Sequence, residues 1–103
     1  MDNPRPTKAQ ISAVRHYLDQ EFPDQLQVTS WDRNMMAQVF VIAQGPVVRH
    51  IVVDLEFFQQ CPDCAAELCN SELADYIHES LSPQRCFRVT WDEGAMRIRS
   101  RPL

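Results

Sequence analysis

The chain has 103 residues, of which 45% are hydrophobic, and a formal net charge of −4. This composition suits one folded domain with a single core and is unlike that of a disordered chain. The sequence contains neither an apolar leader segment nor an apolar run of about 20 residues, so we expect no secretory signal, no membrane helix and a cytoplasmic location in which thiols stay reduced. We expect residues 1–103 to form a single domain whose ends, 1–6 and 102–103, are flexible.

The first predicted element is an α-helix over residues 8–21. Thr7 and Gln10 have the spacing of a capping box, in which each side chain binds the backbone N–H of the other residue. Apolar residues then recur at helical spacing as far as Phe22. Pro23 ends the helix, because the residue before a proline avoids the α conformation.

Three strands are predicted next. Residues 26–31 alternate and are rich in strand-forming side chains, whereas residues 36–43 are apolar at nearly every position. The second pattern indicates a central strand that is buried on both sides or nearly so. Gly45 and Pro46 form a turn, and residues 47–55 make the third strand.

A second helix and a closing hairpin complete the chain. Residues 63–81 have an apolar stripe at helical spacing, which predicts one amphipathic helix; its members are Ala65, Leu68, Cys69, Leu73, Tyr76, Ile77 and Leu81. Residues 86–91 and 95–100 alternate as two strands. We expect one face of this hairpin to carry Phe87, Val89, Trp91, Met96 and Ile98.

Two Trp-Asp pairs, at residues 31–32 and 91–92, each precede a short predicted turn. Aspartate can accept a hydrogen bond from the backbone two residues later, and Asn34 or Gly94 can take a positive φ. An ancestral duplication and convergent hairpin chemistry both explain this repetition.

The predicted element order is α-β-β-β-α-β-β. Strands joined by short turns pair antiparallel, and amphipathic helices cover the face of a sheet. We therefore predict an α+β two-layer sandwich, with a mostly antiparallel five-stranded sheet and two helices packed on one face. This order resembles that of small secretion-type chaperones and, over its first five elements, of double-stranded-RNA-binding domains. The resemblance concerns element order alone, because no residue motif of either family is present.

Cys61-Pro-Asp-Cys64 raises the hypothesis of a redox dithiol. A cysteine just before a helix, with a second one three residues later, has the placement of a reactive thiol whose thiolate the helix N-terminus favours. Asp63 would repel that thiolate, however, and the usual strand-helix-strand context is missing. The alternative interpretation is that Cys61 loosely caps the helix, Cys64 and Cys69 pack as small hydrophobic residues, and Cys86 lies in a strand.

A zinc site would need four ligands, and the candidates are Cys61, Cys64, His78 and Cys86. In one unbroken helix, Cys64 and His78 would lie about 21 Å apart, which is too far to share an ion. The zinc hypothesis therefore requires a helix break near Asn70. We expect no metal and no cofactor.

Charge is distributed unevenly along the chain. No lysine or arginine occurs between His50 and Gln84, whereas arginines are frequent after residue 84. The last predicted strand alternates so that one face carries Arg97, Arg99 and Arg101, which Arg88 of the neighbouring strand can join. We expect this row to bind an anion or an acidic partner. Trp91 is a candidate anchor.

Two alternatives for the arginine row remain open. It is either a solvated outer face that blunts an edge strand, or a surface that meets the acidic helix of another copy. We do not expect nucleic-acid binding, because such domains are usually basic and this chain has a pI near 5.2.

We expect a small cytosolic protein-interaction or adaptor domain that acts by binding or homodimerisation and not by catalysis, and no catalytic residue is assigned. One alternative is a thiol redox or zinc-binding protein that uses Cys61 and Cys64. The other is a secretion-chaperone-like or anionic-ligand-binding module that uses the C-terminal arginine face.

Overall fold

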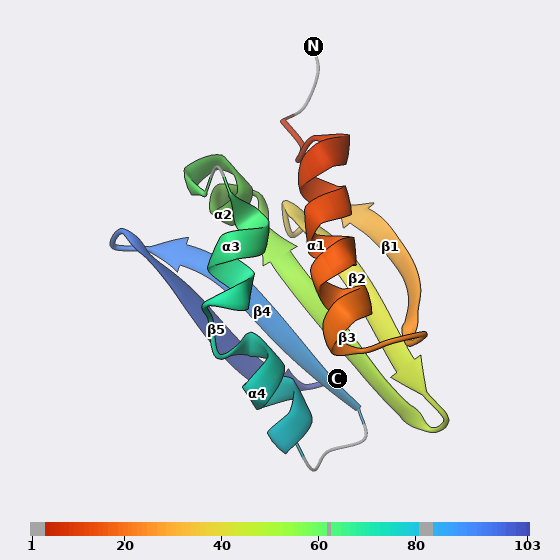
Figure 1. Ribbon diagram of the computed structural model, residues 1–103. Coiled ribbons are helices and arrows are strands. Elements are labelled where there is room, and N and C mark those ends of the chain that lie inside the picture. Colours follow the sequence, from red (N-terminus) through yellow and green to blue (C-terminus); the bar gives the residue numbers. More distant parts are fainter. Residues whose placement is uncertain (1–3, 62, 81–83) are drawn as a thin grey trace.

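The computed structural model describes residues 4–61, 63–80 and 84–103 (Figure 1). These residues form helices and strands in the order α1 (Lys8–Glu21), β1 (Leu26–Asp32), β2 (Ala37–Gln44), β3 (Val47–Asp54), α2 (Leu55–Gln60), α3 (Cys64–Cys69), α4 (Leu73–Glu79), β4 (Gln84–Asp92) and β5 (Ala95–Pro102). The predicted α+β class is confirmed.

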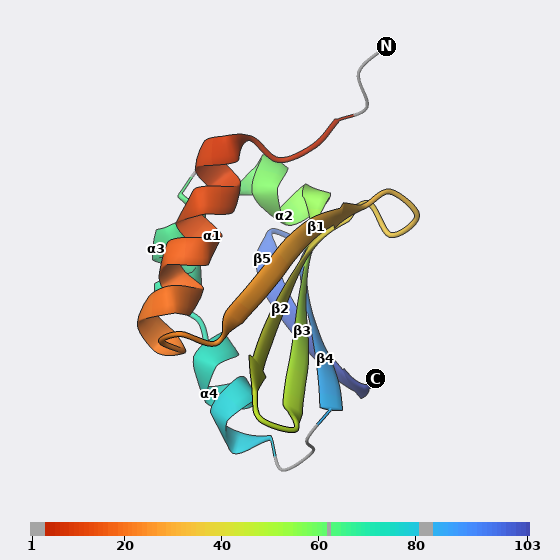
Figure 2. The same cartoon turned by 90° about the vertical axis from the view of Figure 1, so that its right-hand side faces the viewer.

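The five strands form one sheet in the order β1-β2-β3-β4-β5. All neighbours pair antiparallel except β3 and β4, which are parallel. A parallel pair needs a crossover connection, and the segment that contains α2, α3 and α4 supplies it. Figure 2 shows the helices on one side of the sheet, and no described helix covers the other side. We call this uncovered side the open face.

Helix α1 has the predicted bounds and the predicted capping box. The Gln10 backbone N–H donates to Thr7 Oγ1 at 3.1 Å, and the Thr7 N–H donates to Gln10 Oε1 at 2.8 Å. Gln10 Nε2 also donates to the carbonyl oxygen of Phe58 at 2.9 Å. The cap therefore joins α1 to α2 as well as starting α1.

Replacing Thr7 with alanine is expected to lower the free energy of unfolding by about 1 kcal/mol, because an amide at the start of α1 loses its acceptor. Urea denaturation followed by circular dichroism measures this loss. Thr7→Ser keeps the hydroxyl and should stay close to wild type, as should Ser12→Ala at an exposed site within α1. Equal stability of Thr7→Ala and Ser12→Ala would contradict the capping role.

The prediction of one helix over residues 63–81 is wrong. Helix α3 ends at Cys69 and α4 begins at Leu73. Ser71 lies at the break: its Oγ donates to the Leu68 carbonyl at 2.7 Å and accepts the Leu73 N–H at 3.2 Å. A serine hydroxyl that binds nearby backbone competes with helical hydrogen bonds, which explains the interruption. Leu81 lies outside the described residues.

The predicted stripe is correct in part. Leu68, Leu73 and Ile77 are buried, but Cys69 and Tyr76 are exposed. A further difference concerns residues 55–60, which form α2 where the prediction had the end of a strand and a loop. The number of helices on the covered face is therefore four among the described residues, in place of the two predicted.

The core lies between the helices and the covered face of the sheet. The sheet contributes alternate side chains of its inner strands: Phe40, Ile42, Ile51, Val53, Phe87 and Val89. Phe57 and Phe58 of α2 are both buried, with their rings edge to face and the centroids 5.9 Å apart. The predicted hairpin face is confirmed, since Trp91, Met96 and Ile98 pack against this core.

The two Trp-Asp turns differ in detail. Asp32 Oδ1 accepts the N–H groups of Asn34 at 2.9 Å and Met35 at 3.1 Å, as the turn prediction requires. The positive φ falls on Met36 and not on Asn34. In the second turn both Glu93 and Gly94 have positive φ, which is the type I′ geometry of a two-residue hairpin.

Candidate functional site

The open face is defined by the side chains that point away from the helices. Strand pairing places them in rows, because residues opposite one another share a face. One row contains Val41, His50, Cys86 and Arg101, and the next contains Val39, Val52, Arg88 and Arg99. The open face is therefore apolar over β2 and β3 and basic over β4 and β5.

A shallow groove of about 670 Å³ crosses the open face. Its floor consists of Val39, Val41, Val52 and Cys86. Residues 36–43 were predicted to be buried on both sides or nearly so; Phe40 and Ile42 are buried on the covered face, whereas Val39 and Val41 on the open face are half-buried. The walls are more polar and include Asp32, Arg33, His50 and Arg101.

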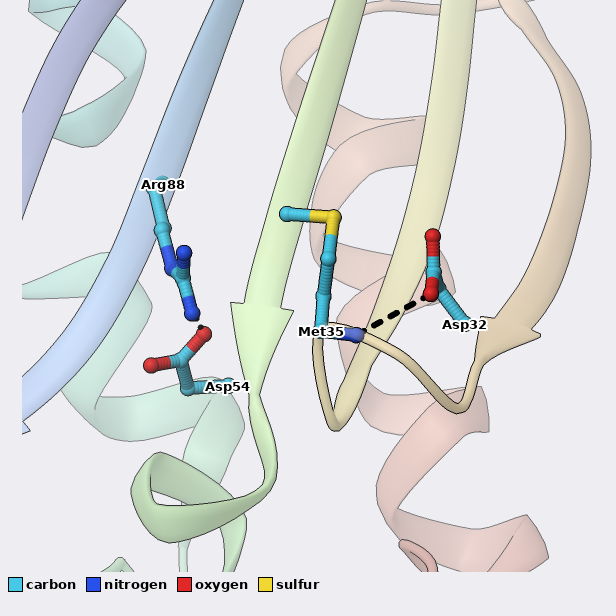
Figure 3. Close-up of polar contacts among 4 residues, drawn as sticks. All are labelled: Asp32, Met35, Asp54 and Arg88. Carbon is cyan, nitrogen blue, oxygen red and sulfur yellow. Dashed lines mark hydrogen bonds and ion pairs between the residues drawn. The ribbon is translucent and has the colours of Figure 1, made fainter.

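Met35 covers one end of the floor. It comes from the turn that Asp32 holds, as Figure 3 shows. Its side chain packs against a small buried cluster of Ala37, Val52 and Cys86. The groove therefore depends on a non-local contact between the β1–β2 turn and the centre of the sheet. The sequence analysis did not identify His50 or Met35 as groove residues. For His50, the alternation of β3 could have indicated that its side chain lies on the open face.

The four arginines share the open face, as the alternation predicted, but they differ in their partners. Arg88 Nε binds Asp54 Oδ1 at 2.9 Å, and the Asp54 side chain is 19% exposed (Figure 3). Arg97 approaches Glu93 at 3.8 Å in an exposed pair that contributes little to stability. Among the described residues, neither Arg99 nor Arg101 has an ion-pair partner.

The register sets Arg88 directly opposite Arg99. Like charges in that position destabilise a sheet, and Asp54 offsets the effect for Arg88 alone. Arg99 and Arg101 thus remain cations whose charges no described acidic side chain neutralises.

Trp91 does not lie beside these arginines. It packs against the core on the covered face, with its ring centroid 6.5 Å from that of Phe57. Trp91 and the arginines are on opposite sides of the same strands, so one partner surface does not include both.

The cysteine segment differs from the predicted redox arrangement. Cys61 is 2% exposed, belongs to the core cluster and is the C-cap of α2. The N-cap of α3 is Asp63, whose side chain accepts the Ala66 N–H at 3.0 Å. The position of the Cys64 side chain lies outside what the structure describes, while Cys69 is exposed and Cys86 is buried in the groove floor.

The helix break that a zinc site would require is present, between Cys69 and Leu73. His78 of α4, however, stacks against Phe22 with the ring centroids 4.7 Å apart. Within residues 4–61, 63–80 and 84–103, no group of three or more histidine, cysteine or acidic side chains is placed to hold a metal ion.

One part of the helical side, formed by α3 and α4, is acidic. The exposed acidic residues of α3, α4 and their connection are Glu67, Glu72, Asp75 and Glu79, and the sequence has no lysine or arginine between His50 and Gln84. The charge of Glu72 raises the pKa of the Tyr76 hydroxyl beside it. The acidic surface of α3 and α4 therefore contrasts with the basic part of the open face over β4 and β5.

The chain matches no family model, and no curated protein or solved structure is significantly similar to it. None of the described helices is long and apolar enough to cross a membrane.

Proposed function

We propose that the chain is a small protein-interaction domain whose open face binds an acidic segment of another protein, and that it acts by binding and not by catalysis. The observation that carries this proposal is the row of arginines on an uncovered sheet face, in which Arg88 and Arg99 oppose each other and, within the described part of the chain, Arg99 and Arg101 have no acidic partner. An anionic partner would neutralise these charges and relieve their repulsion.

The groove supports a polypeptide as the partner. Its half-buried valines offer apolar contact next to Arg101, so an acidic segment with some apolar side chains matches both parts of the surface. A long polyanion such as nucleic acid fits less well, because Asp32 and Glu93 border the same face and the net charge is −4.

A second copy of the chain is the competing occupant. The acidic residues of α3 and α4 on one molecule complement the arginines of another. Such a contact joins two different surfaces, so it would build rings or open chains in place of a two-fold dimer. Light scattering over a range of protein and salt concentrations detects this assembly.

The proposal is tested with a fluorescent glutamate-rich peptide that also contains valine, and with its lysine counterpart as the charge-reversed probe. The glutamate peptide should bind in a salt-dependent manner and the lysine peptide should not. The double variant Arg99→Glu/Arg101→Glu should weaken binding by about tenfold or more, since two favourable contacts become repulsive.

The matched control is Lys8→Glu/Arg15→Glu, which makes the same change in net charge at two exposed positions of helix α1. It should bind the glutamate peptide nearly as well as wild type. Equal weakening in both variants would show that net charge, and not the open face, controls binding. A salt-sensitive assembly that Arg99→Glu/Arg101→Glu disperses would identify a second copy as the occupant.

A further inference from the structure

Strand β5 is an edge of the sheet. It pairs with β4 over its whole length of 8 residues without a register shift. Alternate residues of an edge strand direct their N–H and C=O groups outward, where another strand can bind them. The other edge differs: β1 has an irregularity between Leu26 and Val28, and Arg5 lies over the ring of Trp31. Edge β5 is thus the more regular template.

A second groove, of about 460 Å³, follows this edge. Its strand side is lined by three successive residues, Met96, Arg97 and Ile98. Successive side chains point to opposite faces of a sheet, so lining by three in a row shows that the groove runs along the edge itself. Its other side is formed by α3, α4 and their connection, through Glu67, Asn70, Ser71, Glu72 and Tyr76.

We propose that β5 accepts an added strand from a partner protein, and that this strand alternates acidic side chains with lysine or arginine side chains. The inference rests on the proposed function and refines its partner: the acidic side chains occupy only the face of the added strand that meets the arginines, and basic side chains occupy the other face. Backbone hydrogen bonds to β5 supply the pairing, and the alternation supplies the specificity.

The charges on the two sides of β5 define this pattern. On the open face, an added strand lies next to Arg97, Arg99 and Arg101, which favours acidic side chains there. On the helical side, the added strand lies next to Glu67 and Glu72, which favours side chains that end in a basic group. Long basic side chains also cover Met96 and Ile98 with their hydrocarbon stems.

A second copy of β5 does not satisfy this pattern. If two β5 strands paired antiparallel, arginines would face arginines on the open face. On the helical side, Glu67 and Glu72 would meet the same residues of the second molecule. Repulsion on both faces disfavours self-pairing and reserves the edge for a different chain.

The test uses blocked peptides as long as β5. In the first, glutamate alternates with lysine; in the second, the same residues occur in pairs, Glu-Glu-Lys-Lys, so that each face of a strand has mixed charge. The alternating peptide should bind about tenfold more tightly, because only this peptide places each charge on its complementary side. Equal affinities would overturn the proposal.

N-methylation tests the pairing itself. In an extended strand, the N–H groups of all glutamates point to one edge and those of all lysines to the other. We therefore compare alternating peptides methylated on either set. One of the two should lose binding and the other should retain it, because only one edge faces β5. Two methylated peptides that bind alike, or that both fail, would contradict strand addition.

Protein variants separate this inference from the proposed function. Glu67→Lys should weaken binding of the alternating peptide. Glu79→Lys, an equal charge change outside the groove, should leave this binding unchanged. If Arg99→Glu/Arg101→Glu weakens binding while methylation of either edge makes no difference, the open face binds acidic segments but not as an added strand. If the arginine variant binds as wild type, the proposed function itself fails.

Discussion

Replacing Phe58 with alanine is expected to remove about 3–5 kcal/mol from the free energy of unfolding. The Phe58 side chain is 1% exposed and contacts the ring of Phe57, so its removal leaves a cavity at the centre of the core. A small domain has roughly 5–15 kcal/mol of stability in total, so this loss removes a large share of it and should clearly lower the urea concentration at the unfolding midpoint. Urea denaturation followed by circular dichroism measures the loss.

The matched control for this substitution is Glu56→Ala, in the same short helix. Glu56 is exposed, and its replacement should change stability by less than about 0.5 kcal/mol. If Phe58→Ala were as stable as Glu56→Ala, residues 55–60 would not form a buried helix, and the position of the crossover connection would be wrong.

The protein is expected to lose stability above about pH 10 because of Tyr17. Burial, with the Glu21 charge second, raises the pKa of the Tyr17 hydroxyl from 10.0 to about 12. The unfolded chain then ionises this group at a lower pH than the folded protein. The stabilisation is complete below pH 10 and is lost as the pH rises through the folded pKa, to a total of about 2–3 kcal/mol.

The pH effect of Tyr17 is isolated by comparison with Tyr17→Phe. Phenylalanine does not ionise, so the wild type should lose about 2 kcal/mol more than the variant as the pH rises from about 9 to about 12. Tyr76→Phe is the control, because Tyr76 is 45% exposed and should follow the wild type more closely. A constant stability difference between wild type and Tyr17→Phe across this range would contradict the burial of the Tyr17 hydroxyl.

Local patterns predicted much of the fold. The capping box of Thr7 and Gln10, followed by apolar residues at helical spacing, predicted both ends of α1. The alternation of residues 86–91 and 95–100 predicted the β4–β5 hairpin and its buried face. The sequence predicted these elements because the signals lie within a few residues of the structures that they specify.

The helices between β3 and β4 were harder to predict from the sequence. Ser71 ends α3 by binding the carbonyl of Leu68, yet a serine at this position is compatible with a continuing helix. Helix α2 has only 6 residues, and two adjacent phenylalanines are also typical of strands. Their burial depends on the sheet and on α1, which are remote in the sequence.

The candidate site was predicted in part by alternation. The spacing of Arg97, Arg99 and Arg101 placed them on one face, and the register adds Arg88. The same alternation separates Trp91 from Arg88, because they are an odd number of positions apart in one strand. The sequence did not predict the groove beside the arginines, because the groove requires Met35 to pack over Val52, which is remote from it in the sequence.

The most direct test of the open face and its β5 edge is an amide NMR titration of the protein with the alternating glutamate–lysine peptide. Shift changes should concentrate in β4 and β5, and the outward amides of residues 95–102 should become protected from hydrogen exchange. Arg99→Glu/Arg101→Glu should suppress both effects. Shift changes confined to α1 and β1, or binding without new protection along β5, would contradict docking at this edge.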